Sequence, residues 1–162
     1  MLKKTFKILA QIFEISVVLI FILMVIVGGL QVFNRFILNQ SLSWGEEFQK
    51  FAHIWLIFLT IPIAYQRGAH IGMQVLFNKF PVLIQKILTF CFNLIWLTLA
   101  FVIVRYTIVI MKVTATQTSA GLEIQMSYVY SGLVFGGIYL LILSLWELIQ
   151  NVVDFSRTGK EA

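Results

Sequence analysis

Three long stretches without a charged residue constrain the fold of this chain more than any other feature of its sequence. They run from Ile15 to Asn34, from Ile87 to Val104 and from Ile124 to Trp146. A helix needs about 17–25 predominantly apolar residues to cross a hydrocarbon core of about 30 Å. Each stretch therefore predicts one helix that crosses a membrane.

A fourth apolar stretch, from Phe51 to Gln66, is shorter. The segment from Trp44 to Phe48 extends it into the headgroup region, where tryptophan is favoured. Pro62 is expected to kink or end this helix near its far side. The sequence thus predicts an all-α integral membrane protein with a single four-helix transmembrane domain over residues 1–162, whose spans cover approximately residues 12–36, 44–66, 84–110 and 124–150.

The composition excludes several other classes of protein. Hydrophobic residues make up 60% of the chain and charged residues only 12%, which is far from the composition of a soluble domain. The net charge of +5 comes from lysines and arginines scattered between apolar runs, so we expect no nucleic-acid partner. Cys91 is the single cysteine, which rules out an intramolecular disulfide. The first apolar run is too long for a signal peptide and lacks a cleavage site, so it should remain as the first helix.

The distribution of lysine and arginine predicts the orientation of the chain. An even number of spans places both termini on one side, and cytoplasmic loops carry the excess of positive residues. Eight of the twelve lysines and arginines fall on the side of the termini and four on the other side. We therefore expect both termini in the cytoplasm and the loop from Val113 to Gly121 outside.

Two segments are expected to lie along the membrane surface, in contact with lipid. Lys3, Lys7, Gln11 and Glu14 recur at helical spacing, which gives the start of the first helix a polar stripe. Residues 70–80, ended by Pro81, mix apolar and polar side chains with helical periodicity and predict a short interfacial helix.

Two glutamates and an arginine gather at the predicted outer boundary. Ser43 and Glu46 have the spacing of a capping box, in which each side chain bonds a free backbone N–H at the helix start. Lys50 follows both glutamates by one helical turn, which allows a surface ion pair worth about 0.2–0.5 kcal/mol. A third interpretation pairs Arg35, at the end of the first helix, with Glu46 or Glu47. Contact with a partner protein is a fourth.

His53 continues the polar stripe of Glu46 into the second span, and Thr60 lies two turns further along. Polar groups in a span normally face protein, because unsatisfied groups in hydrocarbon are costly. We therefore expect His53 to form a hydrogen bond inside the bundle. A heme ligand is disfavoured, since the other histidine, His70, lies in the loop on the opposite side.

Gly132 and Gly136 have the small-xxx-small spacing that lets membrane helices approach closely. Thr89, Asn93 and Trp96 form a polar stripe on the third span, which we interpret as structural. Glu14 is compared with the first-helix carboxylate of small multidrug exporters, but its place at the membrane edge favours a solvated role. The chain has no phosphate-binding glycine loop, no HExxH and no nucleophile elbow. These observations predict no catalytic residue, no metal and no cofactor, and hence no enzyme.

Four short motifs occur along the chain: Asn34-Arg35-Phe36, Trp44-Gly45-Glu46-Glu47, Trp55 two turns into the second span, and Arg67-Gly68-Ala69-His70-Ile71. With the four-span layout and the chain length, they resemble the small membrane subunit of tripartite ATP-independent periplasmic (TRAP) transporters. The resemblance covers nearly the whole chain. Gln74 and Thr60-Ile61-Pro62 depart from the family, in which an acidic residue and glycine are common at these places.

The resemblance implies a non-catalytic subunit that scaffolds a larger multi-span carrier subunit in the bacterial inner membrane. A periplasmic substrate-binding protein would deliver an organic acid for sodium-coupled uptake, with sialic acid favoured and a C4-dicarboxylate next. A membrane anchor subunit of a redox enzyme and a stand-alone small exporter are the alternative functions. The residues expected to serve structure or contact with partners are Asn34, Arg35, Trp44, Glu46, Glu47, His53, Trp55, Arg67, His70, Gly132 and Gly136.

Overall fold

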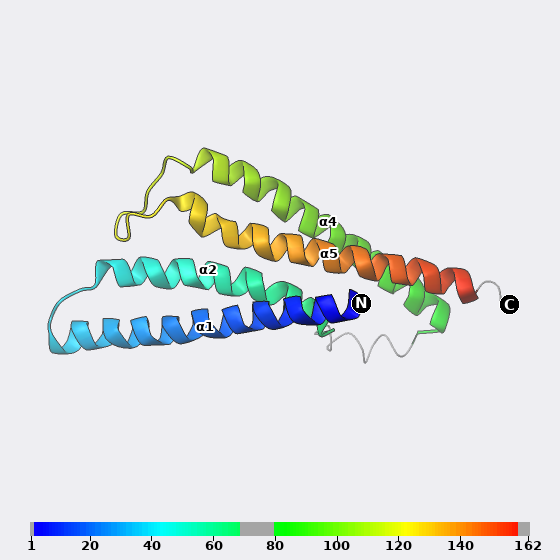
Figure 1. The fold of residues 1–162 in the computed structure, drawn as a ribbon, viewed down its shortest axis with the longest axis horizontal. Helices are drawn as coiled ribbons and strands as arrows, with labels where there is room; N and C mark the ends of the chain where they lie inside the picture. Colours follow the sequence, from blue (N-terminus) through cyan, green and yellow to red (C-terminus); the bar gives the residue numbers. More distant parts are fainter. Residues whose placement is uncertain (1, 69–79, 159–162) are drawn as a thin grey trace.

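The computed structural model describes residues 2–68 and 80–158, which form long helices (Figure 1). The helices are α1 (Leu2–Ile37), α2 (Ser43–Gln66), α4 (Val82–Val113) and α5 (Met126–Thr158). All four are long and apolar enough to cross a membrane, which confirms the predicted number of membrane-spanning helices. The predicted interfacial helix over 70–80, apart from its last residue, and His70 lie outside the described residues.

Three of the helices, α1, α4 and α5, extend beyond the predicted spans at one end or both, whereas α2 matches its span to within one residue. The polar stripe near the N-terminus belongs to one continuous α1, and α5 continues to Thr158. Pro62 does not end α2, which runs four residues further to Gln66. Gly68 follows the C-cap Arg67 with a positive φ of 64° and donates its N–H to the Tyr65 carbonyl. Glycine readily adopts this left-handed conformation, which commonly ends helices.

The helices lie side by side in the order α1, α2, α5, α4, each antiparallel to its neighbour in sequence (Figure 1). The start of α1 and the end of α5 lie at the same end of the molecule, which we call the terminal end. The connections α1–α2 and α4–α5 lie at the opposite end, which we call the loop end (Figure 1). The arrangement is an open array, because α1 and α4 are not packed together into a closed bundle.

The buried core lies where α2, α4 and α5 meet near the terminal end. Its members are Tyr65, Ala100, Tyr139, Leu140 and Leu143. In the most apolar 18-residue segment of α5, 39% of the residues are buried inside the chain. In the corresponding segment of α1, only 6% are buried. The outer helices therefore present most of their apolar side chains to lipid or to another membrane protein.

Candidate functional site

The loop between α4 and α5 folds back over the start of α2. The N–H of Ser119 donates to the carbonyl of Ile124 over 2.9 Å, which closes the loop on itself. At its tip, the N–H groups of Ala120 and Leu122 donate to the two carboxylate oxygens of Glu47 at 3.1 and 3.0 Å. We call Glu47 and residues 120–122 the loop-end clasp. It joins the start of α2 to the connection between the other two helices.

Gly121 lets the tip of this loop lie directly on α2. A Cβ atom at Gly121 would lie 3.2 Å from Glu47 Oε2 and 3.2 Å from Trp44 Cα, which is closer than ordinary van der Waals contact. Trp44 and Glu47, both in the Trp44-Gly45-Glu46-Glu47 motif, therefore support the α4–α5 loop.

The predicted capping box is wrong. Leu42 is the N-cap of α2 and no side chain caps the helix. Ser43 is the first helical residue, so the Ser43–Glu46 spacing is shifted by one position from a capping box. Glu46 is exposed in the first turn, where a negative charge is favourable to the helix dipole.

The predicted ion pair between Arg35 and Glu46 or Glu47 is also wrong. Among the described residues no such pair forms, because Glu47 instead accepts hydrogen bonds from the loop backbone. The Arg35 guanidinium carbon lies 5.9 Å from the centre of the Phe36 ring, within cation–π range. Asn34 lies in the last turn of α1, and its carbonyl accepts hydrogen bonds from the N–H groups of Leu38 and Gln40, just beyond the end of the helix.

A glutamine whose contact the sequence did not predict joins α2 to α1. Gln49 Nε2 donates to the Met24 carbonyl over 2.6 Å, and a Cβ at Gly28 would lie 3.0 Å from that nitrogen. The Gly28-Gly29 pair was the available signal for a close approach in α1. His53 lies on the exposed side of α2 and forms no hydrogen bond with described residues, so the expected internal bond is wrong.

The small-residue face of α5 lies against α2. A Cβ at Gly132 would lie 2.8 Å from Trp55 Cδ2, and one at Gly136 would collide with the Phe58 carbonyl oxygen. The Trp55 ring also lies 6.0 Å from the Phe135 ring. The structure thus brings Trp55, Gly132 and Gly136 together at the α2–α5 contact.

Polar side chains join the helices at the terminal end. Tyr65 donates its hydroxyl to Asn93 Oδ1 over 3.2 Å, which links α2 to α4. Tyr139 donates to Gln66 Oε1 over 3.0 Å, which links α5 to α2. We call these four residues, with Glu14 and Arg67, the terminal-end cluster. The sequence predicted a structural role for Asn93 but for neither tyrosine. Tyr65 lies next to the end of its apolar run, whereas Tyr139 lies well inside its run.

Arg67 and Glu14 form an ion pair at 2.5 Å that joins α2 to α1. The side chain of Glu14 is therefore paired and not only solvated, in contrast to the prediction. The two side chains are 66% and 38% exposed, and pairs this exposed contribute at most about 1 kcal/mol to stability. The pair joins the two helices but contributes little to the stability of the fold.

The loop-end clasp and the terminal-end cluster have the same role: in each, polar groups from different helices or loops bond to one another. No group of three or more His, Cys, Asp or Glu side chains that could hold a metal ion occurs among the residues described. What the arrangement can do is fix the relative positions of four membrane helices at the loop end and at the terminal end.

Comparisons with known proteins agree with a role in transport. Residues 24–154 match the family model described as the DctQ component of tripartite ATP-independent periplasmic transporters. A protein of Haemophilus influenzae named as a TRAP transporter small permease is 26% identical over 144 residues, which are 89% of this chain and 89% of the relative.

Two further relatives carry TRAP transporter names. A second Haemophilus influenzae protein named as a small permease is 22% identical over 82% of both chains. The isethionate TRAP transporter permease protein DctMQ of Oleidesulfovibrio alaskensis is 30% identical over 83 residues, which are 50% of this chain and 13% of that protein. None of these findings supports the redox-anchor alternative. Because the family model matches most of its length, the chain belongs to the DctQ family of TRAP transporter components.

Proposed function

We propose that this chain scaffolds a larger multi-span carrier subunit in the bacterial inner membrane and does not itself translocate solute. The observation that carries the proposal is the open array. Exposed large apolar side chains recur along α1 from Ile8 to Ile37. Only 6% of the residues in its most apolar 18-residue segment are buried within the chain. Helices arranged in this way can pack against a second membrane protein.

The loop-end clasp and the terminal-end cluster supply the rigidity that a scaffold requires. Glu47 joins α2 to the α4–α5 loop at one end, and the Tyr65–Asn93 and Tyr139–Gln66 bonds join three helices at the other. A frame fixed at both ends can hold its position while a neighbouring carrier changes conformation.

The DctMQ relative supports a large permease as the partner. The matched segment is only 13% of that protein, so a segment similar to this chain is joined there to a much longer permease. Here we propose that the two parts are separate subunits that assemble in the membrane.

The transported solute is proposed to be an organic acid taken up with sodium and delivered by a periplasmic binding protein. Sialic acid is favoured and a C4-dicarboxylate comes next. Isethionate, in the name of one relative, is another small organic anion. With both termini in the cytoplasm, the loop end faces the periplasm, and exposed Arg35 and Glu46 lie where the binding protein would approach.

Co-purification tests the assembly. An affinity-tagged form of this chain is co-expressed with a large TRAP permease from the same organism, extracted in mild detergent and analysed by size-exclusion chromatography. The two proteins should elute as one stable complex, and an unrelated multi-span protein expressed in the same cells should not. Separate elution of the two subunits would rule out the scaffold role.

A further inference from the structure

Arg105 is a charged residue far inside a membrane-spanning helix. It is exposed and lies in α4, eight residues before the helix ends at Val113. At 1.5 Å per residue, this separation is about 12 Å along the helix axis. The predicted third span, residues 84–110, ends five residues after Arg105, and the helix continues about two turns beyond Arg105 to Val113.

The neighbouring helices show the depth of Arg105 in the array. A Cβ at Gly137 would lie 2.9 Å from Val104 Cγ2, and one at the adjacent Gly136 would collide with the Phe58 carbonyl. Val104 is therefore close to the level of Phe58, which lies near the middle of α2. Arg105 is at the level of the central part of the array and not at its edge.

The described part of the chain provides no partner for the charge of Arg105. Arg105 forms no ion pair or hydrogen bond with any residue that the structure describes. Helix α4 packs mainly against α5 and contacts α2 through Asn93 and Trp96, whereas Arg105 is exposed. Charged side chains within membrane spans are costly, and they almost always face protein or water and pair with another group.

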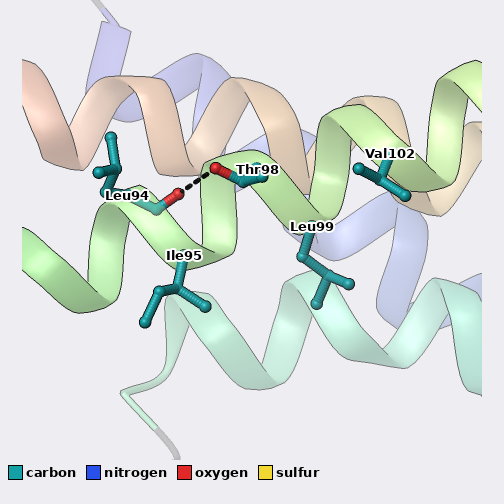
Figure 2. Close-up of a pocket in the computed structure, with 5 residues that line it drawn as sticks. All are labelled: Leu94, Ile95, Thr98, Leu99 and Val102. Carbon is teal, nitrogen blue, oxygen red and sulfur yellow. Dashed lines mark hydrogen bonds between the residues drawn. The ribbon is translucent and has the colours of Figure 1, made fainter.

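A shallow apolar groove lies on α4 in the turns that precede Arg105. It is lined by Leu94, Ile95, Thr98, Leu99 and Val102 (Figure 2). Thr98 donates its hydroxyl to the Leu94 carbonyl over 2.8 Å (Figure 2), so it offers no free donor to a ligand. Leu94, Thr98, Val102 and Arg105 follow one another by four, four and three residues, which places them on one helix face.

An apolar face with one central cation fits a protein helix better than a lipid. Lipid phosphates lie at the membrane boundary, and Lys112 in the last turn of α4 is exposed at the position to meet them. Arg105 lies seven residues before that lysine, about 10 Å further from the loop end of the helix, and we infer that it lies at the depth of the acyl chains. A carboxylate at this depth must be carried by a protein segment that crosses the membrane.

We propose that the face of α4 from Leu94 to Arg105 is a docking surface for a transmembrane helix of the large permease subunit, and that an aspartate or glutamate of this helix pairs with Arg105. This inference rests on the proposed function, because it takes the large permease as the partner. It adds to that proposal the helix of this chain that contacts the large permease, the face of that helix and the charged residue that forms the pair.

Charge variants test the pairing in the complex of the two subunits. Arg105→Ala and Arg105→Glu should lower recovery of the large permease by at least about tenfold, since loss of one partner leaves the other charge buried alone. Arg105→Lys should retain most of the complex. Lys112→Ala, on the same helix, is the matched control and should recover it fully. The melting temperature of the isolated chain should not change in Arg105→Ala, because Arg105 bonds to none of the residues that the structure describes.

A photo-crosslinking residue at Val102, beside Arg105, identifies the neighbour. Crosslinked peptides should map to a membrane helix of the large permease that has an acidic residue within one turn of the crosslink. Crosslinks to lipid alone or to a helix without an acidic residue, or full recovery of both Arg105→Ala and Arg105→Glu, would overturn the inference. If the unaltered chain itself fails to retain the large permease, it is the proposed function that fails.

Discussion

Glu47 acts through hydrogen bonds to backbone, not through pairing with another charge. Its two oxygens accept from the N–H groups of Ala120 and Leu122, and hydrogen bonds to a charged acceptor are stronger than those between neutral groups. Glu46, its neighbour in the sequence, is exposed. Two adjacent carboxylates thus have different roles because only one of them points at the loop.

Glu47→Gln should loosen the loop-end clasp. A neutral amide oxygen accepts more weakly, and the amide nitrogen cannot accept from the second N–H group. We expect the melting temperature in detergent to fall by several degrees and the amides of Ala120 and Leu122 to exchange hydrogen faster. Glu46→Gln is the matched control and should leave both quantities unchanged. Equal effects of the two substitutions would contradict the clasp.

A charge swap separates the clasp from the rejected ion pair. Because Arg35 lies against Phe36 and not against Glu47, the double variant Arg35→Glu with Glu47→Arg should melt no higher than Glu47→Arg alone. Recovery of the melting temperature in the double variant would restore the ion-pair interpretation.

The number and type of the helices follow from the sequence, whereas their packing does not. Runs such as Ile15 to Asn34 need no tertiary information to be interpreted as spans, because hydrocarbon admits few other structures. The partners of Glu47 lie 73 and 75 residues further along the chain, and no local pattern encodes that distance. The capping-box prediction failed for a local reason. The sequence pattern does not fix the first residue of a helix to within one position, and α2 has Leu42, not Ser43, as its N-cap.

The glycines of α5 are a second case in which the sequence predicted a contact but not the helix that makes it. The spacing of Gly132 and Gly136 predicted a close approach of some helix, but it did not identify α2 as the neighbour. The contact with Phe58 depends on the order of the helices in the array, which the hydropathy pattern does not specify.

Gly136→Ala should destabilise the contact between α2 and α5. A Cβ there would collide with the Phe58 carbonyl oxygen, so the two backbones must separate, and such overpacking costs about 1–3 kcal/mol. Gly29→Ala in α1 is the matched control, because nothing lies within 4 Å of the added Cβ. Alanine is the better helix former by about 1 kcal/mol, so the control should be neutral or stabilising. Thermal unfolding of both variants in detergent measures the difference, and a neutral Gly136→Ala would contradict the close contact.

At the scale of the whole molecule, the open array has two distinguishable ends. The loop end carries the α4–α5 connection, and the terminal end carries the start of α1 and the end of α5 (Figure 1). The excess of lysine and arginine on the side of the termini predicts that the loop end faces the periplasm.

Cysteine labelling tests this orientation. In a Cys91→Ala background, a cysteine at exposed Thr116 should react with a membrane-impermeant maleimide in intact spheroplasts. A cysteine at exposed Gln66, at the terminal end of α2, should react only after the membrane is permeabilised. The reverse pattern would place the termini in the periplasm.

Solute uptake by reconstituted vesicles tests the central claim most directly. Four sets of vesicles are compared under an inward sodium gradient with the cognate binding protein and its organic acid: this chain alone, the large permease alone, both subunits together, and empty vesicles. A supporting subunit predicts sodium-driven accumulation with both subunits together and none with this chain alone. Accumulation in vesicles that contain only this chain would contradict the account.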